Sequence, residues 1–176
     1  MSRVGRGLAR RVRGIGTRRP RRVLVAFGVV VALLAAGVVT LSWYDRRAAQ
    51  VEQARTAALK AAERQAVTVL SYDFRSINRD LERARSALTG QFLEDFTELT
   101  TQVVAPAAKQ QQISTSAKVV GSSVVEADPD RAVVLLFVNQ TTKTAQAQMP
   151  QLSGSRVQLT LVEVDGRWLI SELDPI

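Results

Sequence analysis

One uncharged, apolar run near the N-terminus constrains this chain more than any other feature. Residues 23–44 read VLVAFGVVVALLAAGVVTLSWY and contain no charged side chain. An α-helix of this length extends about 33 Å, which is enough to cross the hydrocarbon core of a bilayer. We therefore predict a membrane-spanning helix whose final aromatic pair suits the headgroup level. Its representative residues are Val23, Phe27, Leu33, Leu34, Val38, Trp43 and Tyr44.

Arginines on one side of this run predict its orientation. Residues 1–22 hold nine arginines and no acid, and the whole chain carries +8, so residues 23–176 sum to −1. The arginines nearest the run are Arg18, Arg19, Arg21 and Arg22. Because positively charged flanks stay in the cytoplasm, we expect a single-pass protein of the inner (plasma) membrane. Its N-terminus would be cytoplasmic and its C-terminal domain periplasmic or extracytoplasmic.

The same distribution of charge bears on binding partners. An arginine-rich tail beside a span contacts the anionic headgroups of a phospholipid membrane. A nucleic-acid-binding protein shows a basic face on its folded domain, and a region with a net charge of −1 does not favour such a face. We therefore expect the membrane as a partner and no nucleic acid.

A cleaved signal peptide is the alternative to a retained anchor. Cleavage requires a shorter apolar core that ends at a small-residue site. Here the core is long and runs into the bulky Trp43 and Tyr44, which favours retention. Small residues within the span would let a neighbouring helix approach closely, although they are also common on lipid-facing helices. These candidate helix–helix contact residues are Gly28, Ala32, Ala35, Ala36 and Gly37.

The residue types that many enzyme and metal sites need are missing. The chain contains no cysteine and no histidine, which excludes disulfides, Cys/His zinc sites and histidine-dependent catalytic groups. Glu94, Asp95 and Glu98 are spaced as a solvated helix face rather than a metal site or catalytic pair. Tyr72-Asp73 is the only pair that could point into the domain, and a capping or packing role is the more usual one. We predict no catalytic, metal-binding or cofactor-binding residue, and no enzymatic activity.

Beyond the span, the pattern first favours a helix. Residues 46–70 are rich in good helix formers, and an apolar face repeats at steps of three and four. Its members are Val51, Ala54, Ala58, Ala62, Ala66 and Val69. We expect this helix to pack against its own domain, since the heptad series of a coiled coil is missing. The predicted parts of the chain are the tail (1–22), the span (23–44), the stalk and first domain helix (45–70) and the rest of the domain (71–176).

A second helical pattern begins at Ile77. Its apolar positions are Ile77, Leu81, Ala84, Leu88, Phe92, Phe96, Leu99 and Val103. Ser76 is expected to cap the start, Thr89-Gly90 to divide the stretch into two helices, and Pro106 to close it. A glutamine-rich connector is then expected at residues 109–112.

The period next changes to two, which predicts an antiparallel sheet. Residues 113–127 are β-rich with a bulge expected at Gly121, and the apolar run 132–138 predicts a central strand covered on both faces. The remaining expectations are a loop at 149–155, a strand around 157–161 and a hairpin at Asp165-Gly166 leading into 168–170. About three helices packed on one face of a curved sheet of about four strands make an α+β domain.

This order of elements resembles the cystatin-like cone of the nuclear-transport-factor-2-like superfamily. Four segments also resemble the Mce-associated membrane proteins of actinobacteria. These are LSYD at 70–73, RDLERARSALTGQF at 79–92, VLLFVNQTT at 134–142 and DGRWLISELDP at 165–175. Members of that family accompany transporters that import lipids and sterols. The resemblance implies a non-enzymatic accessory or stabilising subunit of an Mce-type importer, with Mce subunits including the permease as partners and no cofactor.

Two other functions remain open. A VirB-type assembly scaffold of a type IV secretion channel has the same plan of cytoplasmic tail, single span and cone-shaped outer domain. A lipid-binding cone is the other alternative. Phe92, Phe96, Phe137 and Trp168 are expected in the core, but a cone mouth lined by them could hold a lipid ligand.

Overall fold

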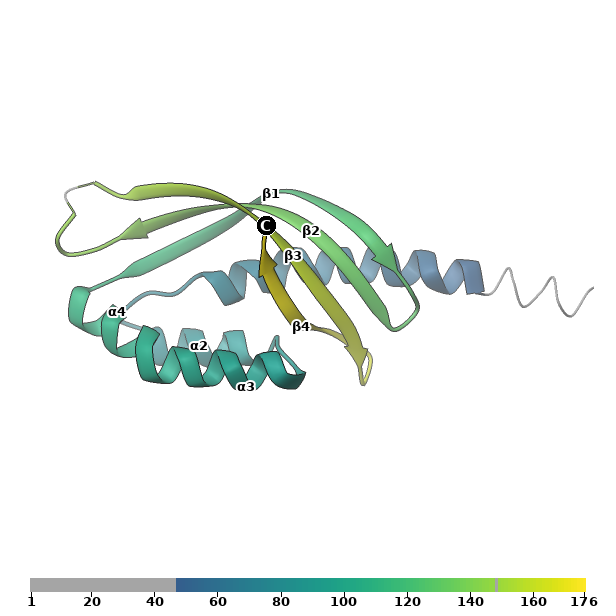
Figure 1. The fold of residues 1–176 in the computed structure, drawn as a ribbon, viewed down its shortest axis with the longest axis horizontal. Helices are drawn as coiled ribbons and strands as arrows, with labels where there is room; N and C mark the ends of the chain where they lie inside the picture. The colour runs from purple at the N-terminus through teal and green to yellow at the C-terminus, as the bar shows by residue number, and fades with distance from the viewer. Residues whose placement is uncertain (1–46, 148) are drawn as a thin grey trace, which may run out of the picture. The chain divides into compact units, whose positions relative to one another are not determined.

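The computed structural model describes residues 47–147 and 149–176, which form helices followed by a sheet (Figure 1). A first helix covers residues 47–70. The later elements are α2 (Ile77–Arg85), α3 (Gly90–Leu99), the π-helical segment η1 (Thr100–Val104), α4 (Ala105–Gln111), β1 (Ser114–Ala127), β2 (Arg131–Lys143), β3 (Gln151–Val164) and β4 (Arg167–Pro175). The predicted tail with Arg18–Arg22, and the predicted span Val23–Tyr44 with its small residues Gly28–Gly37, lie outside the described residues. No helix within the described ranges is long and apolar enough to cross a membrane.

The four strands form one antiparallel meander in the order β1-β2-β3-β4. Figure 1 shows the sheet curving over the first helix, with α2 and α3 on the same side. This arrangement confirms the predicted α+β architecture of three helices on a curved four-stranded sheet. The hairpin at Asp165-Gly166 is also confirmed, since both residues adopt the positive φ (51° and 76°) that a tight turn of this kind requires.

The core lies between the first helix and the inner face of the sheet. Ala54, Ala58, Ala62, Ala66 and Val69 are all buried, so the predicted apolar face of the helix packs on its own domain. Alanine carries no long side chain, and the helix can therefore lie close to the strands. The strand residues that meet it include Val134, Leu136, Val138, Val157, Leu159, Leu161 and Ile170. These side chains fill the interior of the cone.

Loop segments cover part of both outer strands. Tyr72 pairs with Thr115 of β1 through two backbone hydrogen bonds of 2.9 and 2.8 Å. On the opposite edge, Thr89 donates its N–H to Ile170 of β4 at 3.0 Å, and Ile170 donates to Ala87 at 2.9 Å. The segments on either side of α2 thus satisfy strand edges that would otherwise be open.

The start of α2 differs from the prediction in one respect. Ser76 is the residue before the helix, but its hydroxyl makes no capping bond to the backbone. It donates instead to the Asp80 carboxylate at 2.7 Å, because that carboxylate is buried beside it. The predicted division at Thr89-Gly90 is confirmed, since Gly90 has φ +63° and begins α3.

The predicted end of the helical stretch at Pro106 is wrong. The chain continues from α3 through η1 into α4, where Pro106 lies in the first turn and lacks no required helical hydrogen bond. Ala105 donates its N–H to Thr100, five residues earlier, so the preceding turn holds one extra residue. The predicted connector is therefore helical as far as Gln111.

The π-helical turn also changes which side chains face inward. Leu99 and Val103, which were predicted on the apolar face, are both 55 % exposed. Thr100 is buried in their place and donates its hydroxyl to the Phe96 carbonyl at 2.6 Å. Because of the inserted residue, apolar side chains no longer recur at steps of three and four on the inner face of this helical stretch.

The strands are longer than predicted. Residues 151–155, predicted as a loop, belong to β3 and pair with the second half of β2, as in the pair Asn139 and Gly154. A bulge next to Gly121 is confirmed by the register shift between Val119 and Gly121, and a second shift follows between Val124 and Glu126. The run 132–138 is central, but it is not covered on both faces, because Phe137 is 42 % exposed.

Candidate functional site

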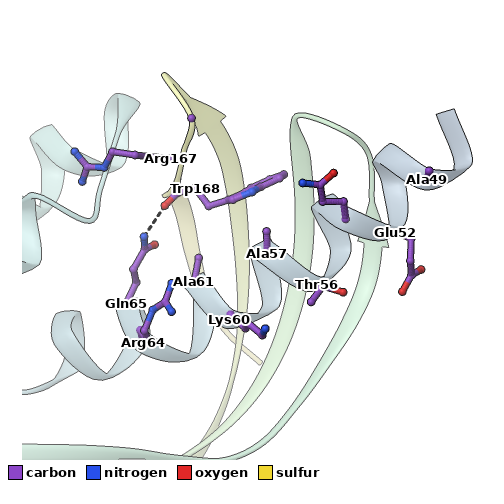
Figure 2. A pocket seen from close by; sticks show the side chains of 12 residues that line it. Ala49, Glu52, Thr56, Ala57, Lys60, Ala61, Arg64, Gln65, Arg167 and Trp168 are labelled. Atoms are coloured by element: carbon purple, nitrogen blue, oxygen red, sulfur yellow. Dashed lines mark hydrogen bonds between the residues drawn. The ribbon is translucent and has the colours of Figure 1, made fainter. Parts of the chain in front are cut away.

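A groove of about 940 Å³ lies between the first helix and the start of β4 (Figure 2). Its lining residues are Ala49, Glu52, Gln53, Thr56, Ala57, Lys60, Ala61, Arg64, Gln65, Gly166, Arg167 and Trp168. The helix contributes residues at steps of three and four, which places them on one face. That face lies next to the one that packs on the sheet, so the groove runs beside the core and is open to solvent.

Trp168 and Gln65 join the two walls of the groove. The Gln65 amide nitrogen donates to the Trp168 main-chain carbonyl, 103 residues later in the sequence. The Trp168 side chain is half-buried, packs against the core and extends toward the helix face of Ala57 and Ala61 (Figure 2). The Gln65 side-chain oxygen is buried and has no partner among the described residues. A tryptophan face beside small alanines can receive an apolar side chain of a partner.

The rim of the groove is polar. Lys60 and Arg64 are exposed along one side, and Glu52 lies nearer the start of the helix. Arg167 points away from the groove, since its guanidinium donates to the Ser86 carbonyl at 3.0 Å (Figure 2). An apolar floor with a charged, solvated rim is typical of a protein-binding surface.

The Tyr72-Asp73 pair does not point into the cone. Tyr72 packs against a small cluster formed by Ile77, Leu81 and Ala108. The Asp73 carboxylate accepts hydrogen bonds from the Arg75 backbone N–H (2.9 Å), from its guanidinium (2.9 and 3.0 Å) and from the Ser114 hydroxyl (3.1 Å). These bonds, above all those from the Arg75 side chain, hold the pKa of Asp73 well below its usual range. We call residues 71–80 the corner; its polar pair has the packing role that was predicted.

Asp80 is the buried carboxylate of the corner. Burial by itself raises its pKa, but hydrogen bonds from the Ser76 hydroxyl, the Asp73 N–H and the Arg83 guanidinium outweigh that effect and leave the pKa below its ordinary value. An aspartate with this many donors is held in the charged form. It fixes the turn between the first helix and α2 and is not poised to accept a proton in a reaction.

The other acids predicted to form a solvated face do so. Glu94, Asp95 and Glu98 are all exposed on α3. The described parts of the chain contain no group of three or more acidic side chains that could hold a metal ion. Of the four aromatic residues predicted in the core, Phe92, Phe96 and Trp168 pack against it, whereas Phe137 lies on the other face of the sheet. The four do not line a common mouth.

The groove was not predicted from the sequence. The apolar face from Val51 to Val69 leaves Lys60 and Arg64 on the other side of the helix, where both are exposed, but it gives no role to Gln65. The local signal was a polar side chain four residues after Ala61, on a ridge that otherwise carries alanines. This local pattern does not predict that Gln65 contacts Trp168 on a distant strand.

One family matches this chain over residues 21–175, which is nearly its whole length. The chain belongs to the family described as uncharacterized protein Rv1363c/MT1408-like. Two proteins of Mycobacterium tuberculosis are similar to this chain. The outer membrane protein Rv1973 is 42 % identical over 156 residues, covering 87 % of this chain and 97 % of the relative. The uncharacterized protein Rv1362c is 38 % identical over 160 residues, covering 91 % and 73 %.

Solved structures share the fold at low sequence identity. An IcmL-like type IV secretion system protein of Legionella pneumophila has a TM-score of 0.59 at 12 % identity and covers 69 % of this chain and 93 % of its own. The VirB8 protein of Agrobacterium tumefaciens has a TM-score of 0.55 at 12 % identity and covers 72 % and 92 %. The similarity confirms the predicted nuclear-transport-factor-2-like cone as the fold of the described residues.

Proposed function

We propose that this protein is a non-enzymatic, membrane-anchored assembly subunit of a transport complex in the cell envelope. The observation that carries the proposal is the fold of residues 47–176, which is shared with VirB8 and an IcmL-like secretion protein over most of their lengths. The predicted span immediately before this domain completes the plan expected of a VirB-type scaffold. Such a scaffold acts by holding other subunits, and its surfaces matter more than any reactive group.

The groove beside Trp168 is the surface best suited to hold a partner. Its floor combines Trp168 with Ala57 and Ala61, and its rim carries the exposed Lys60 and Arg64. Tryptophan and arginine are enriched among the residues that dominate binding energy at interfaces. The filled interior of the cone gives less support to a lipid ligand, because leucine and isoleucine side chains occupy the space that a tail would need.

A location in the envelope fits this function. The relative Rv1973 is named an outer membrane protein, and a structure with the same fold, at a TM-score of 0.58 and 16 % identity, is the periplasmic domain of DotI. We place the N-terminus of this chain in the cytoplasm and its domain on the far side of the plasma membrane, anchored by residues 23–44. The phospholipid membrane is then a partner, and nucleic acid is not.

An accessory subunit of an Mce-type lipid importer is the second candidate. The resemblance of four segments to Mce-associated membrane proteins favours it, including the ending at residues 165–175 that forms the hairpin and β4. Its partners would be Mce subunits and the permease. The two candidates share the scaffold role and differ in the complex that is held.

Co-purification in mild detergent distinguishes the two complexes. The tagged full-length protein is extracted from its native membranes, and the proteins that accompany it are identified. Channel components and an ATPase of a secretion system support the first candidate, and Mce subunits with a permease support the second. Recovery of the protein alone, under conditions that keep other membrane complexes intact, would contradict both.

A matched pair of charge changes tests the groove. Arg64→Glu reverses a rim charge and should lower the recovery of partner subunits by about tenfold if that rim meets an acidic surface. Arg55→Glu is the control, since Arg55 is exposed on the same helix but does not line the groove. Equal recovery with both variants would remove the groove from the proposal while leaving the scaffold role to the co-purification result.

A further inference from the structure

The outer face of the sheet, turned away from the helices, carries three apolar residues along β2, namely Val133, Leu135 and Phe137. They alternate with the inward residues Val134 and Leu136, which are fully buried. On the outer face, neighbouring side chains bury Val133, Leu135 is half-buried, and Phe137 is exposed. Phe137 is 42 % exposed, a large value for a phenylalanine in a central strand. None of the helices among the described residues packs on this side. The exposed ring and the half-buried Leu135 beside it offer a small apolar area to a partner.

Gly121 lies beside the Phe137 ring. It lies opposite Phe137 in the β1–β2 register, and a Cβ atom placed on it would meet the Phe137 ring at 3.4 Å. The ring therefore lies next to a residue of the neighbouring strand that has no side chain to cover it. Two sheets that pack face to face are about 10 Å apart, a distance that side chains of this size can span.

Charges divide the same face into two ends. At one end, Lys118 lies opposite Asn139, and Arg156 lies opposite Phe137. At the other end, Glu126 lies opposite Val133, Glu172 opposite Thr160 and Asp174 opposite Gln158. All five charged side chains are exposed. Arg131 is also exposed at the end near Val133, where it pairs with Glu126 at 3.6 Å. The named groups therefore sum to +2 at the end near Phe137 and to −2 at the end near Val133.

We propose that this outer face binds a second copy of the chain. A two-fold axis running across the strands between Leu135 and Phe137 places the basic end of each copy over the acidic end of the other. Lys118 then meets Glu126 of the second copy, Arg156 meets Asp174, and Phe137 packs on Leu135. Such a contact is isologous, because the same patch serves both subunits.

Self-association suits this surface better than a lipid bilayer does. An anionic membrane would be repelled by the cluster of Glu126, Glu172 and Asp174. The alternating ends instead select one antiparallel arrangement of two identical faces, since the parallel arrangement would stack like charges. The inference is independent of which envelope complex the protein joins.

Cysteine cross-linking in membranes tests the contact. The chain has no cysteine, so one introduced thiol reports on a single position. Phe137→Cys in the full-length protein should give a cross-linked dimer with a short bifunctional thiol reagent. Leu99→Cys is the control, because Leu99 is similarly exposed, at 55 %, but lies on α3. Equal dimer formation at both positions, or a cross-link from Phe137→Cys to a different protein, would overturn the proposal.

Charge reversal tests the predicted arrangement. In the Phe137→Cys background, Lys118→Glu and Glu126→Lys should each lower the dimer yield by about fivefold, and the two together should restore it. Glu126 also pairs with Arg131 at 3.6 Å, but both are exposed and that pair contributes little to folding. Glu98→Lys is a matched control on α3 and should leave the yield unchanged. A double variant that yields no more dimer than the single variants would rule out the proposed axis.

Discussion

The main core and the corner are two solutions to the same problem of fixing a helix on a sheet. In the core, alanines of the first helix pack on aliphatic strand residues without a charged group among them. In the corner, residues 71–80 are held by two carboxylates that between them accept bonds from backbone, hydroxyl and guanidinium donors. The stability of the core depends on the volume of its side chains, and the stability of the corner depends on the ionisation of Asp73 and Asp80. Changes in side-chain size and changes in pH should therefore separate the two regions.

The largest expected effect comes from removing volume in the core. Leu136 is fully buried, and Leu136→Ala should lower the free energy of unfolding by about 2–5 kcal/mol because it leaves a cavity. Denaturant unfolding of the full-length protein in detergent, followed by circular dichroism, measures the change. The loss of unfolding free energy should be the same at pH 7 and pH 5. A clear pH dependence would contradict the distinction between the core and the corner.

Adding volume to the core should be the next largest effect. Ala62 is fully buried against the strands, and Ala62→Leu forces the helix away from the sheet at about 1–3 kcal/mol or more. The same unfolding measurement applies, with Lys60→Ala as the control on the exposed side of the same helix. A neutral Ala62→Leu variant would mean that the helix does not lie as close to the sheet as its alanines indicate.

The corner should respond to pH instead. Asp80→Asn should lower the free energy of unfolding by about 1–3 kcal/mol at pH 7, because three donors lose a charged acceptor. The folded-state pKa of Asp80 is depressed, so its stabilisation is fully present above the unfolded-state value of about 4 and is lost as the pH falls through the folded-state value. Urea titrations from pH 7 to pH 2.5 should show the wild-type and variant curves converging. Parallel curves would contradict the role of ionisation.

The smallest expected effect comes from removing an exposed charge beside the corner. Arg79 lies 4.0 Å from Asp80, but its side chain is 75 % exposed. Arg79→Ala should change the free energy of unfolding by no more than about 0.5 kcal/mol, since exposed ion pairs are weak. Thermal unfolding of this variant beside Asp80→Asn gives the test. A loss as large as that of Asp80→Asn would show that the corner relies on surface charge and not on buried hydrogen bonds.

The periodicity of the sequence predicted most of the fold. The apolar face from Ala54 to Val69, the break at Thr89-Gly90 and the hairpin at Asp165-Gly166 all follow from local spacing or turn chemistry. The helical continuation past Pro106 did not, because it depends on one residue inserted in the π-helical turn before the proline. The strand at residues 151–155 was missed as well, since its polar residues pair with β2 without being buried.

The candidate surfaces were less predictable than the fold. The groove needs Gln65 and Trp168, which lie 103 residues apart and meet only when the hairpin folds over the helix. Phe137 was predicted to be a core residue because its neighbours in the run 132–138 are apolar. Its exposure depends on which face of β2 the helices cover, and a continuous apolar run does not encode that choice.

The two bulges of β1 limit how this sheet can grow. The first residues of the strand are already paired with Tyr72, and beyond them the extra residues Val120 and Val125 interrupt the regular repeat of backbone donors and acceptors. A strand of another chain therefore cannot form a long, regular ladder of backbone hydrogen bonds along this edge of the sheet. The domain gains protection from fibril formation in this way, without placing a row of charges along the strand.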